Sequence, residues 1–110
     1  MTMAYTTAKE SIEKMPVVFD ANAAKGLNAV FQFNLTGDDG GQWNLTVKDG
    51  TCELQEGAHA APTVTLTLAG TTWLSIVNKK MNAMQASMSG RLKTVGNMLT
   101  AQKIPTVFPL

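Results

Sequence analysis

The sequence predicts an α+β protein in which a sheet with one apolar face is flanked by helical segments. Between residues 27 and 68, apolar side chains recur at almost every second position, which is the period of a half-buried strand. Before and after this region, apolar residues are spaced by three and four positions, and residues that commonly cap helices precede these segments, which indicates helices. A length of 110 residues suffices for one hydrophobic core, so we treat residues 1–110 as a single domain.

The first helix is predicted to begin at Thr7 and to end before Pro16. Thr7 and Glu10 have the spacing of a capping box, in which each side chain accepts a hydrogen bond from the other residue's backbone. The residue before a proline disfavours helical geometry, which predicts the end of the helix. Asp20 is then expected to cap a short turn that ends at Gly26.

Four strands follow, each with one apolar and one polar face. Asp49-Gly50 predicts a two-residue hairpin turn, and Gly-Asp-Asp-Gly-Gly at 37–41 predicts another turn. The alternation predicts an antiparallel sheet that is covered on one side only. The side chains expected on the covered face are Leu27, Ala29, Phe31, Phe33, Leu35, Trp43, Leu45, Val47, Cys52, Leu54, Val64, Leu66 and Leu68.

After residue 70 the sequence predicts helices and a weakly patterned fifth strand. A helix begins near residue 71, and a second is capped by Asn82 and ended by Gly90. Residues 91–95 are the strand candidate. Asn97 is expected to cap a last helix that continues through Ile104 and is stopped by Pro105.

Four of the seven methionines lie between residues 81 and 98. Met81, Met84 and Met88 are spaced by three and four residues, so they share one face of a helix. Periodicity alone favours ordinary core packing for such a stripe. The alternative is a soft wall for ligands of several shapes, because methionine is flexible and polarisable.

Composition and charge argue against several classes of protein. Nine basic and eight acidic residues give a net charge of +1, without a basic run, which disfavours a nucleic-acid binder. One cysteine cannot form an internal disulfide, and no apolar stretch has the length of a membrane span. The N-terminus lacks the features of a signal peptide, so we expect a cytoplasmic protein.

No group of residues predicts catalysis. His59 is the single histidine and falls in an expected loop, where we expect it to be solvated. Cys52 falls on the apolar side of its strand, and no base is near it in sequence. Asp38-Asp39 lacks the spacing of a calcium loop. The sequence therefore predicts no metal site, no cofactor and no enzymatic activity.

Two long stretches, taken together, resemble a known family. FQFNLTGDDGGQWNLTVKDGTCELQEG is similar to the first three strands of sterol carrier protein-2-like (SCP2) domains, and APTVTLTLAGTTWLSIVNKKMNAMQASMSGRLKTVGNM is similar to their remainder. The resemblance runs from about Tyr5 to Phe108. It implies a five-stranded, mostly antiparallel sheet with about five helices on one face and a hydrophobic tunnel between them. Family members accept fatty acyl chains, acyl-CoA, phospholipids or sterols there, without a cofactor. At Thr94 the fifth strand usually has a larger apolar residue.

With this resemblance, the methionine stripe is interpreted as part of a ligand wall. The predicted ligand-binding residues are Phe33, Leu35, Trp73, Ile76, Met81, Met84, Met88, Met98, Leu99 and Gln102, with Gln102 placed to hydrogen-bond a headgroup. The predicted function is to bind and carry or store hydrophobic ligands. The alternative is an accessory or dimerisation module for a partner enzyme.

The expected partner is a lipid or other hydrophobic small molecule, and transient contact with a membrane surface is a further expectation. No nucleic-acid partner is expected, and a homodimer is a further option. The basic residues near the methionines, among them Lys79, Lys80, Arg91 and Lys93, are either an ordinary solvated surface or attract anionic headgroups.

Overall fold

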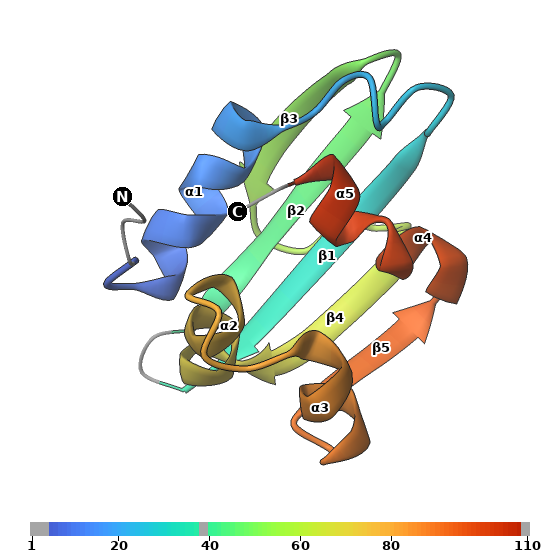
Figure 1. The fold of residues 1–110 in the computed structure, drawn as a ribbon. Coiled ribbons are helices and arrows are strands. Elements are labelled where there is room, and N and C mark those ends of the chain that lie inside the picture. Colours follow the sequence, from blue (N-terminus) through green and yellow to red (C-terminus); the bar gives the residue numbers. More distant parts are fainter. Residues whose placement is uncertain (1–4, 38–39, 109–110) are drawn as a thin grey trace.

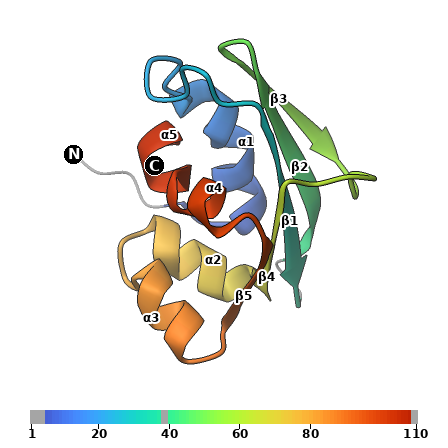
Figure 2. The same ribbon diagram turned by 90° about the vertical axis from the view of Figure 1, so that its right-hand side faces the viewer.

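Five strands form one sheet, and the helices cover one of its faces. The computed structural model describes residues 5–37 and 40–108, with Pro105 described by its backbone only. The strands are β1 (Ala29–Thr36), β2 (Gly41–Lys48), β3 (Thr51–Glu56), β4 (Val64–Ala69) and β5 (Leu92–Gly96). The helices are α1 (Ala8–Val18), α2 (Gly70–Val77), α3 (Ala83–Met88), α4 (Met98–Gln102) and α5 (Ile104–Val107). Figures 1 and 2 show the helices together on one side of the sheet.

The strand order is β3-β2-β1-β4-β5, so β3 and β5 are the two edges of the sheet. Three neighbouring pairs are antiparallel, and the central pair, β1 with β4, is parallel. The predicted α+β class and the mostly antiparallel sheet are confirmed, although the parallel pair makes the sheet a mixed one. The predicted hairpin at Asp49-Gly50 is also confirmed, because both residues have positive φ angles, 52° and 75°.

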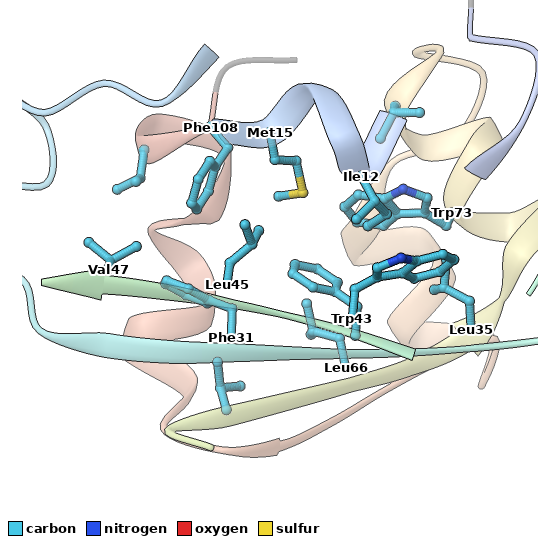
Figure 3. Packing of buried hydrophobic residues seen from close by; sticks show 14 of the residues in the cluster. Ile12, Met15, Phe31, Leu35, Trp43, Leu45, Val47, Leu66, Trp73 and Phe108 are labelled. Carbon is cyan, nitrogen blue, oxygen red and sulfur yellow. The ribbon is translucent and has the colours of Figure 1, made fainter. Parts of the chain in front are cut away.

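The predicted division of side chains between the two faces is confirmed for β1 and β2. Phe31 pairs with Leu45, and both are fully buried beneath the helices, as is Phe33. Figure 3 shows Phe31, Leu45 and other sheet residues pointing toward the helices, where Phe108 lies. The rings of Phe31 and Phe108 meet edge to face, with centroids 5.9 Å apart. The core therefore lies between the centre of the sheet and helices from both ends of the chain.

The second face of the sheet is not left entirely to solvent, contrary to the prediction of a sheet covered on one side only. Gln32 and Asn44 point to that face, yet each is only 3% exposed. The connection from β3 to β4 must pass from the edge strand to a strand beyond β1, and it crosses this face. The Gln32 side chain donates to the Gly57 carbonyl at 3.3 Å and accepts from the His59 amide at 2.8 Å. Asn44 donates to the same Gly57 carbonyl at 3.1 Å.

Two predicted helix ends at prolines are wrong. α1 has half of the expected capping box, because the Glu10 amide donates to the Thr7 hydroxyl at 3.1 Å while the Glu10 carboxylate accepts from Thr6. The helix continues through Pro16 to Val18. A proline removes one backbone hydrogen bond, and the packing of the buried Met15 holds the last turn in place. Pro105 does not end the helical region either, because it takes a first-turn position of α5, where no backbone N–H is needed.

The expected caps of the later helices are confirmed. Asn82 and Gln85 form a capping box at the start of α3. The Thr100 amide donates to the Asn97 side chain at 3.1 Å at the start of α4. These caps hold α3 and α4 at the two ends of β5, and both helices contact that strand.

Candidate functional site

Three of the predicted ligand-binding residues lie in the packed core. Phe33 is fully buried, and Leu35 and Trp73 are each 5% exposed. The rings of Phe33 and Trp73 are in contact, with centroids 5.2 Å apart. Figure 3 shows the Trp73 indole beside Ile12 of α1 and close to the sheet. In this structure the helices and the central strands therefore fill the space between them with their own side chains.

A buried hydrogen bond fixes Trp73 in this position. Its indole N–H donates to the Ser11 hydroxyl at 2.7 Å, and that hydroxyl donates to the Ala8 carbonyl at 2.7 Å. Ser11 is fully buried although it is polar. The pair satisfies the polar atom of a large apolar side chain and joins α1 to α2 over the sheet. The sequence analysis did not identify Ser11, because a serine among apolar helix positions gives no signal of its partner.

The cover over the sheet becomes thinner toward both edge strands, because Cys52 and Leu54 on β3 are only half-buried, like the inward residues of β5. On β4, Leu66 and Leu68 are buried at 6% and 3% exposure. Their partners on β5, Thr94 and Leu92, face the same side but are only half-buried. Ile76 of α2 is also only partly buried against the core. The small Thr94 contributes little apolar volume at a position that faces the helices.

The remaining predicted residues lie at this thinly covered edge. Met81 is half-buried in the connection that leads into α3, while Gln102 is exposed near the end of α4. Figure 2 shows α3, β5 and α4 together along one side of the molecule, with α2 beside them. We call α3, β5, α4 and their connecting turns, residues 83–102, the β5 edge. The exposed fractions of its predicted residues are 70% for Met84, 84% for Met88, 53% for Met98 and 72% for Leu99.

The structure thus divides the predicted residues into a buried group and an edge group. Phe33, Leu35 and Trp73 form the first, and Met84, Met88, Met98, Leu99 and Gln102 belong to the second; Ile76 and Met81 are half-buried and belong to neither. Sequence analysis missed Leu92 and Val95 of β5, because the strand is short and weakly patterned. Val95 is 67% exposed on the opposite face of that strand.

Two surface hollows are lined by other residues. One is lined by residues of the 40–43 and 56–57 segments with Lys9, and the other by the 25–28 segment with Ala21, Asp49 and Gly50. Neither is lined by a predicted ligand-binding residue. The apolar tunnel therefore stays a prediction.

Cys52 and His59 are both half-buried in this fold. Cys52 is half-buried, and burial raises the pKa of its thiol to about 11, which disfavours the reactive thiolate. His59, expected in solvent, is half-buried, and its Nδ1 accepts a hydrogen bond from the Ala61 amide at 2.9 Å. Within residues 5–37 and 40–108, no group of three or more His, Cys, Asp or Glu side chains could hold a metal ion.

Comparison with known proteins agrees with this architecture. A family model described as the SCP-2 sterol transfer family matches residues 13–109. The chain belongs to this family. The resemblance seen in the sequence is thereby confirmed over nearly the whole chain, and SCP2 domains of this family bind lipids. In the described part of this SCP2 domain, no helix is both long and apolar enough to span a bilayer.

Relatives of this SCP2 domain include both small proteins and parts of much larger ones. The oleate-induced peroxisomal protein POX18 of Candida maltosa is 35% identical over 89 residues, which cover 78% of this chain and 70% of that protein. Peroxisomal multifunctional enzyme type 2 of Mus musculus is 31% identical over 86 residues, which cover 76% of this chain but only 12% of the enzyme.

A solved structure matches the SCP2 domain along almost its full length. The solution structure of palmitated SCP2L2 from Aedes aegypti is 27% identical, with a TM-score of 0.74. The match covers 96% of this chain and 95% of that one. The relative carries palmitate on the same fold.

Proposed function

We propose that this SCP2 domain binds and carries or stores hydrophobic ligands with long apolar chains, and that the ligand enters between the helices and the sheet at the β5 edge. The observation that carries the proposal is the loss of cover from the centre of the sheet to β5. Phe33 on β1 is fully buried, whereas Leu92 and Thr94 on β5 are half-buried beside helices that expose methionines. An apolar core that opens at one edge next to exposed apolar side chains suits the entry of an apolar chain.

The apolar chain of the ligand would supply most of the binding free energy. Each CH₂ group removed from water contributes roughly 0.8 kcal/mol, so a long acyl chain needs few polar contacts. The palmitated relative from Aedes aegypti supports a fatty acyl chain as the ligand class. Acyl-CoA, phospholipid and sterol-like ligands remain within the proposal, since all present an extended apolar surface.

The predicted residues would act at different stages of binding. Met84, Met88 and Leu99 are exposed at the β5 edge, so they would meet the ligand first. Phe33 and Trp73 are packed against each other, so they would contact it only after the helix layer has moved away from the sheet. Gln102 would donate to a headgroup or carbonyl oxygen at the outer end.

The proposal involves no covalent step and no cofactor. The ligand exchanges with a membrane through transient contact, and a cytoplasmic location stays an expectation, since two relatives are named as peroxisomal. A homodimer is compatible with this mode of action.

Native mass spectrometry of the protein purified from its own host, followed by lipid extraction, tests the proposal. We expect a discrete adduct with the mass of a fatty acyl lipid that is released by organic solvent. Protein that carries no lipid, and that takes up none when incubated with palmitate, would contradict the carrier function.

A second candidate is an accessory module for an enzyme. It is favoured by the mouse multifunctional enzyme, in which the matching region is 12% of a longer chain. In that case the same mass spectra should show lipid-free protein together with a stoichiometric protein partner.

A further inference from the structure

Exposed apolar side chains are concentrated at the β5 edge. Among the described residues, six large apolar side chains are strongly exposed: four belong to α3 and α4, Val95 of β5 faces the other side of the sheet, and Val17 belongs to α1. α3 and α4 both contact β5, so these side chains come from neighbouring elements. Solvent-exposed apolar residues that are scattered singly need no explanation, but a concentration along one edge indicates a surface that is covered in use.

The same half of the chain is purely cationic. Residues 57–110 contain five Lys and Arg residues and no Asp or Glu, whereas residues 1–56 contain four basic and eight acidic residues. Arg91 and Lys93 lie within the β5 edge, where Lys93 pairs with Thr67 on the face of the sheet away from the helices, and Lys79, Lys80 and Lys103 flank this edge in sequence. All five are exposed, and none forms an ion pair within the described residues.

The acidic residues of α1, of β3 and of the β2–β3 hairpin lie away from the β5 edge. Glu53 and Glu56 are on β3, which is the opposite edge of the sheet, and Asp49 is in the hairpin that leads into it. Glu10 and Glu13 are on α1, which packs on α2 and over the β3 side of the sheet. Although the net charge of the chain is only +1, its positive charge is gathered toward the β5 side.

We propose that the β5 edge is the surface by which the protein docks on anionic lipid bilayers, with Met84, Met88, Met98 and Leu99 inserted between headgroups and Arg91 and Lys93 against the phosphates. The inference rests on the proposed function, because docking at this edge would open the thinly covered core directly onto the lipid. Exposed apolar side chains among cations suit an interface that has apolar and anionic layers. A nucleic acid would use the cations but not the methionines.

Sedimentation with vesicles tests the docking. The full chain is mixed with vesicles of phosphatidylcholine alone or of phosphatidylcholine with phosphatidylglycerol, at low and high salt. We expect binding to the anionic vesicles, weakened by salt because of charge screening. The double variant R91Q/K93Q should bind about 25-fold more weakly, since each cation near an anionic surface is worth about fivefold.

Matched variants separate this edge from general charge and apolarity. K25Q/K48Q removes the same charge from exposed sites in the acidic half, and it should weaken binding much less. Val17 and Leu99 are equally exposed, at 73% and 72%, so Leu99→Ser should weaken binding whereas Val17→Ser should not. If the two variants of either pair lost the same amount of vesicle affinity, the proposal would be overturned. It would also be overturned if the protein bound duplex DNA as tightly as anionic vesicles and Leu99→Ser did not change the DNA affinity.

Palmitate binding without vesicles, measured on the same variants, distinguishes the two hypotheses. Wild-type protein that binds palmitate but not anionic vesicles would overturn the docking and leave the carrier function intact. Edge-dependent vesicle binding without palmitate binding would support the docking and contradict the carrier function.

Discussion

A single buried hydrogen bond from the Trp73 indole joins the helices α1 and α2 above the sheet. Its N–H donates to Ser11 inside an apolar core, so the hydroxyl and the indole must stay together for both to remain satisfied. The Trp73 ring also packs against Phe33, so a ligand that contacts Phe33 from the helix side would have to displace it. The contact therefore bears both on stability and on how readily the core opens.

We predict that Ser11→Ala lowers the free energy of unfolding by about 1–3 kcal/mol, because it leaves a buried indole N–H without an acceptor. Urea denaturation of the delipidated protein measures the change. The control is Ser75→Ala, since the Ser75 hydroxyl bonds only to the Thr71 carbonyl of its own helix. We expect the control to stay within about 0.5 kcal/mol of the wild type. Equal losses in the two variants would contradict a special role for the Ser11–Trp73 pair.

The methionines of α3 are predicted to affect ligand binding more than stability. Met84 and Met88 are 70% and 84% exposed, so cutting either to alanine should change the free energy of unfolding by less than about 0.5 kcal/mol. Leu45→Ala, at a fully buried site, should cost about 2–5 kcal/mol. Chemical denaturation and palmitate titration of the same three variants provide the comparison. If the methionine variants bind palmitate with the affinity of the wild type, these side chains are not part of the ligand site.

At the scale of elements, the β3–β4 connection is the feature that periodicity could not reveal. Alternation placed Gln32 and Asn44 correctly on the polar face of the sheet. It gave no information on the path of residues 57–63, which cover both side chains. The two prolines misled for a related reason, since tertiary packing and first-turn geometry decide whether a proline ends a helix.

Gln32 is predicted to anchor this connection. Its side chain bonds to Asn34, to the Gly57 carbonyl and to the His59 amide, whereas the buried Oδ1 of Asn44 has no partner in the part of the chain that the structure describes. Gln32→Leu should therefore lower the free energy of unfolding by about 1–3 kcal/mol and speed hydrogen exchange of the His59 amide. Asn44→Leu should be closer to neutral, because it also removes an unsatisfied oxygen. A larger loss in Asn44→Leu than in Gln32→Leu would show that Asn44 holds the connection instead.

At the scale of the whole molecule, the sequence predicted the sheet, its faces and the family, but less of the site. The period of two was enough to predict that Phe31 and Leu45 face the core, because side chains of a strand point to one of two faces of the sheet. Helical spacing grouped Met84 with Met88 but could not say whether their shared face meets the core or solvent. That depends on how α3 sits against β5, which is a tertiary property.

The separation of charge along the chain becomes informative only with the fold. In sequence it is a run without acidic residues after Glu56, and a net charge of +1 conceals it. The strand order then places β3, which carries Glu53 and Glu56, and β5, which carries Lys93, at opposite edges of the sheet. The charge of the molecule is thereby polarised between the two edges, and the β5 edge is the one whose neighbouring helices expose large apolar side chains.

The central claim is that this SCP2 domain holds a long apolar chain by burying it. Calorimetric titration of delipidated protein with palmitate and with octanoate tests this most directly, because the two acids share a carboxylate and differ only in chain length. Each additional buried CH₂ should add roughly 0.8 kcal/mol, so palmitate should bind far more tightly. Equal affinities for the two acids, or no heat of binding with palmitate at either of two well-separated temperatures, would contradict the account, since apolar burial changes the heat capacity.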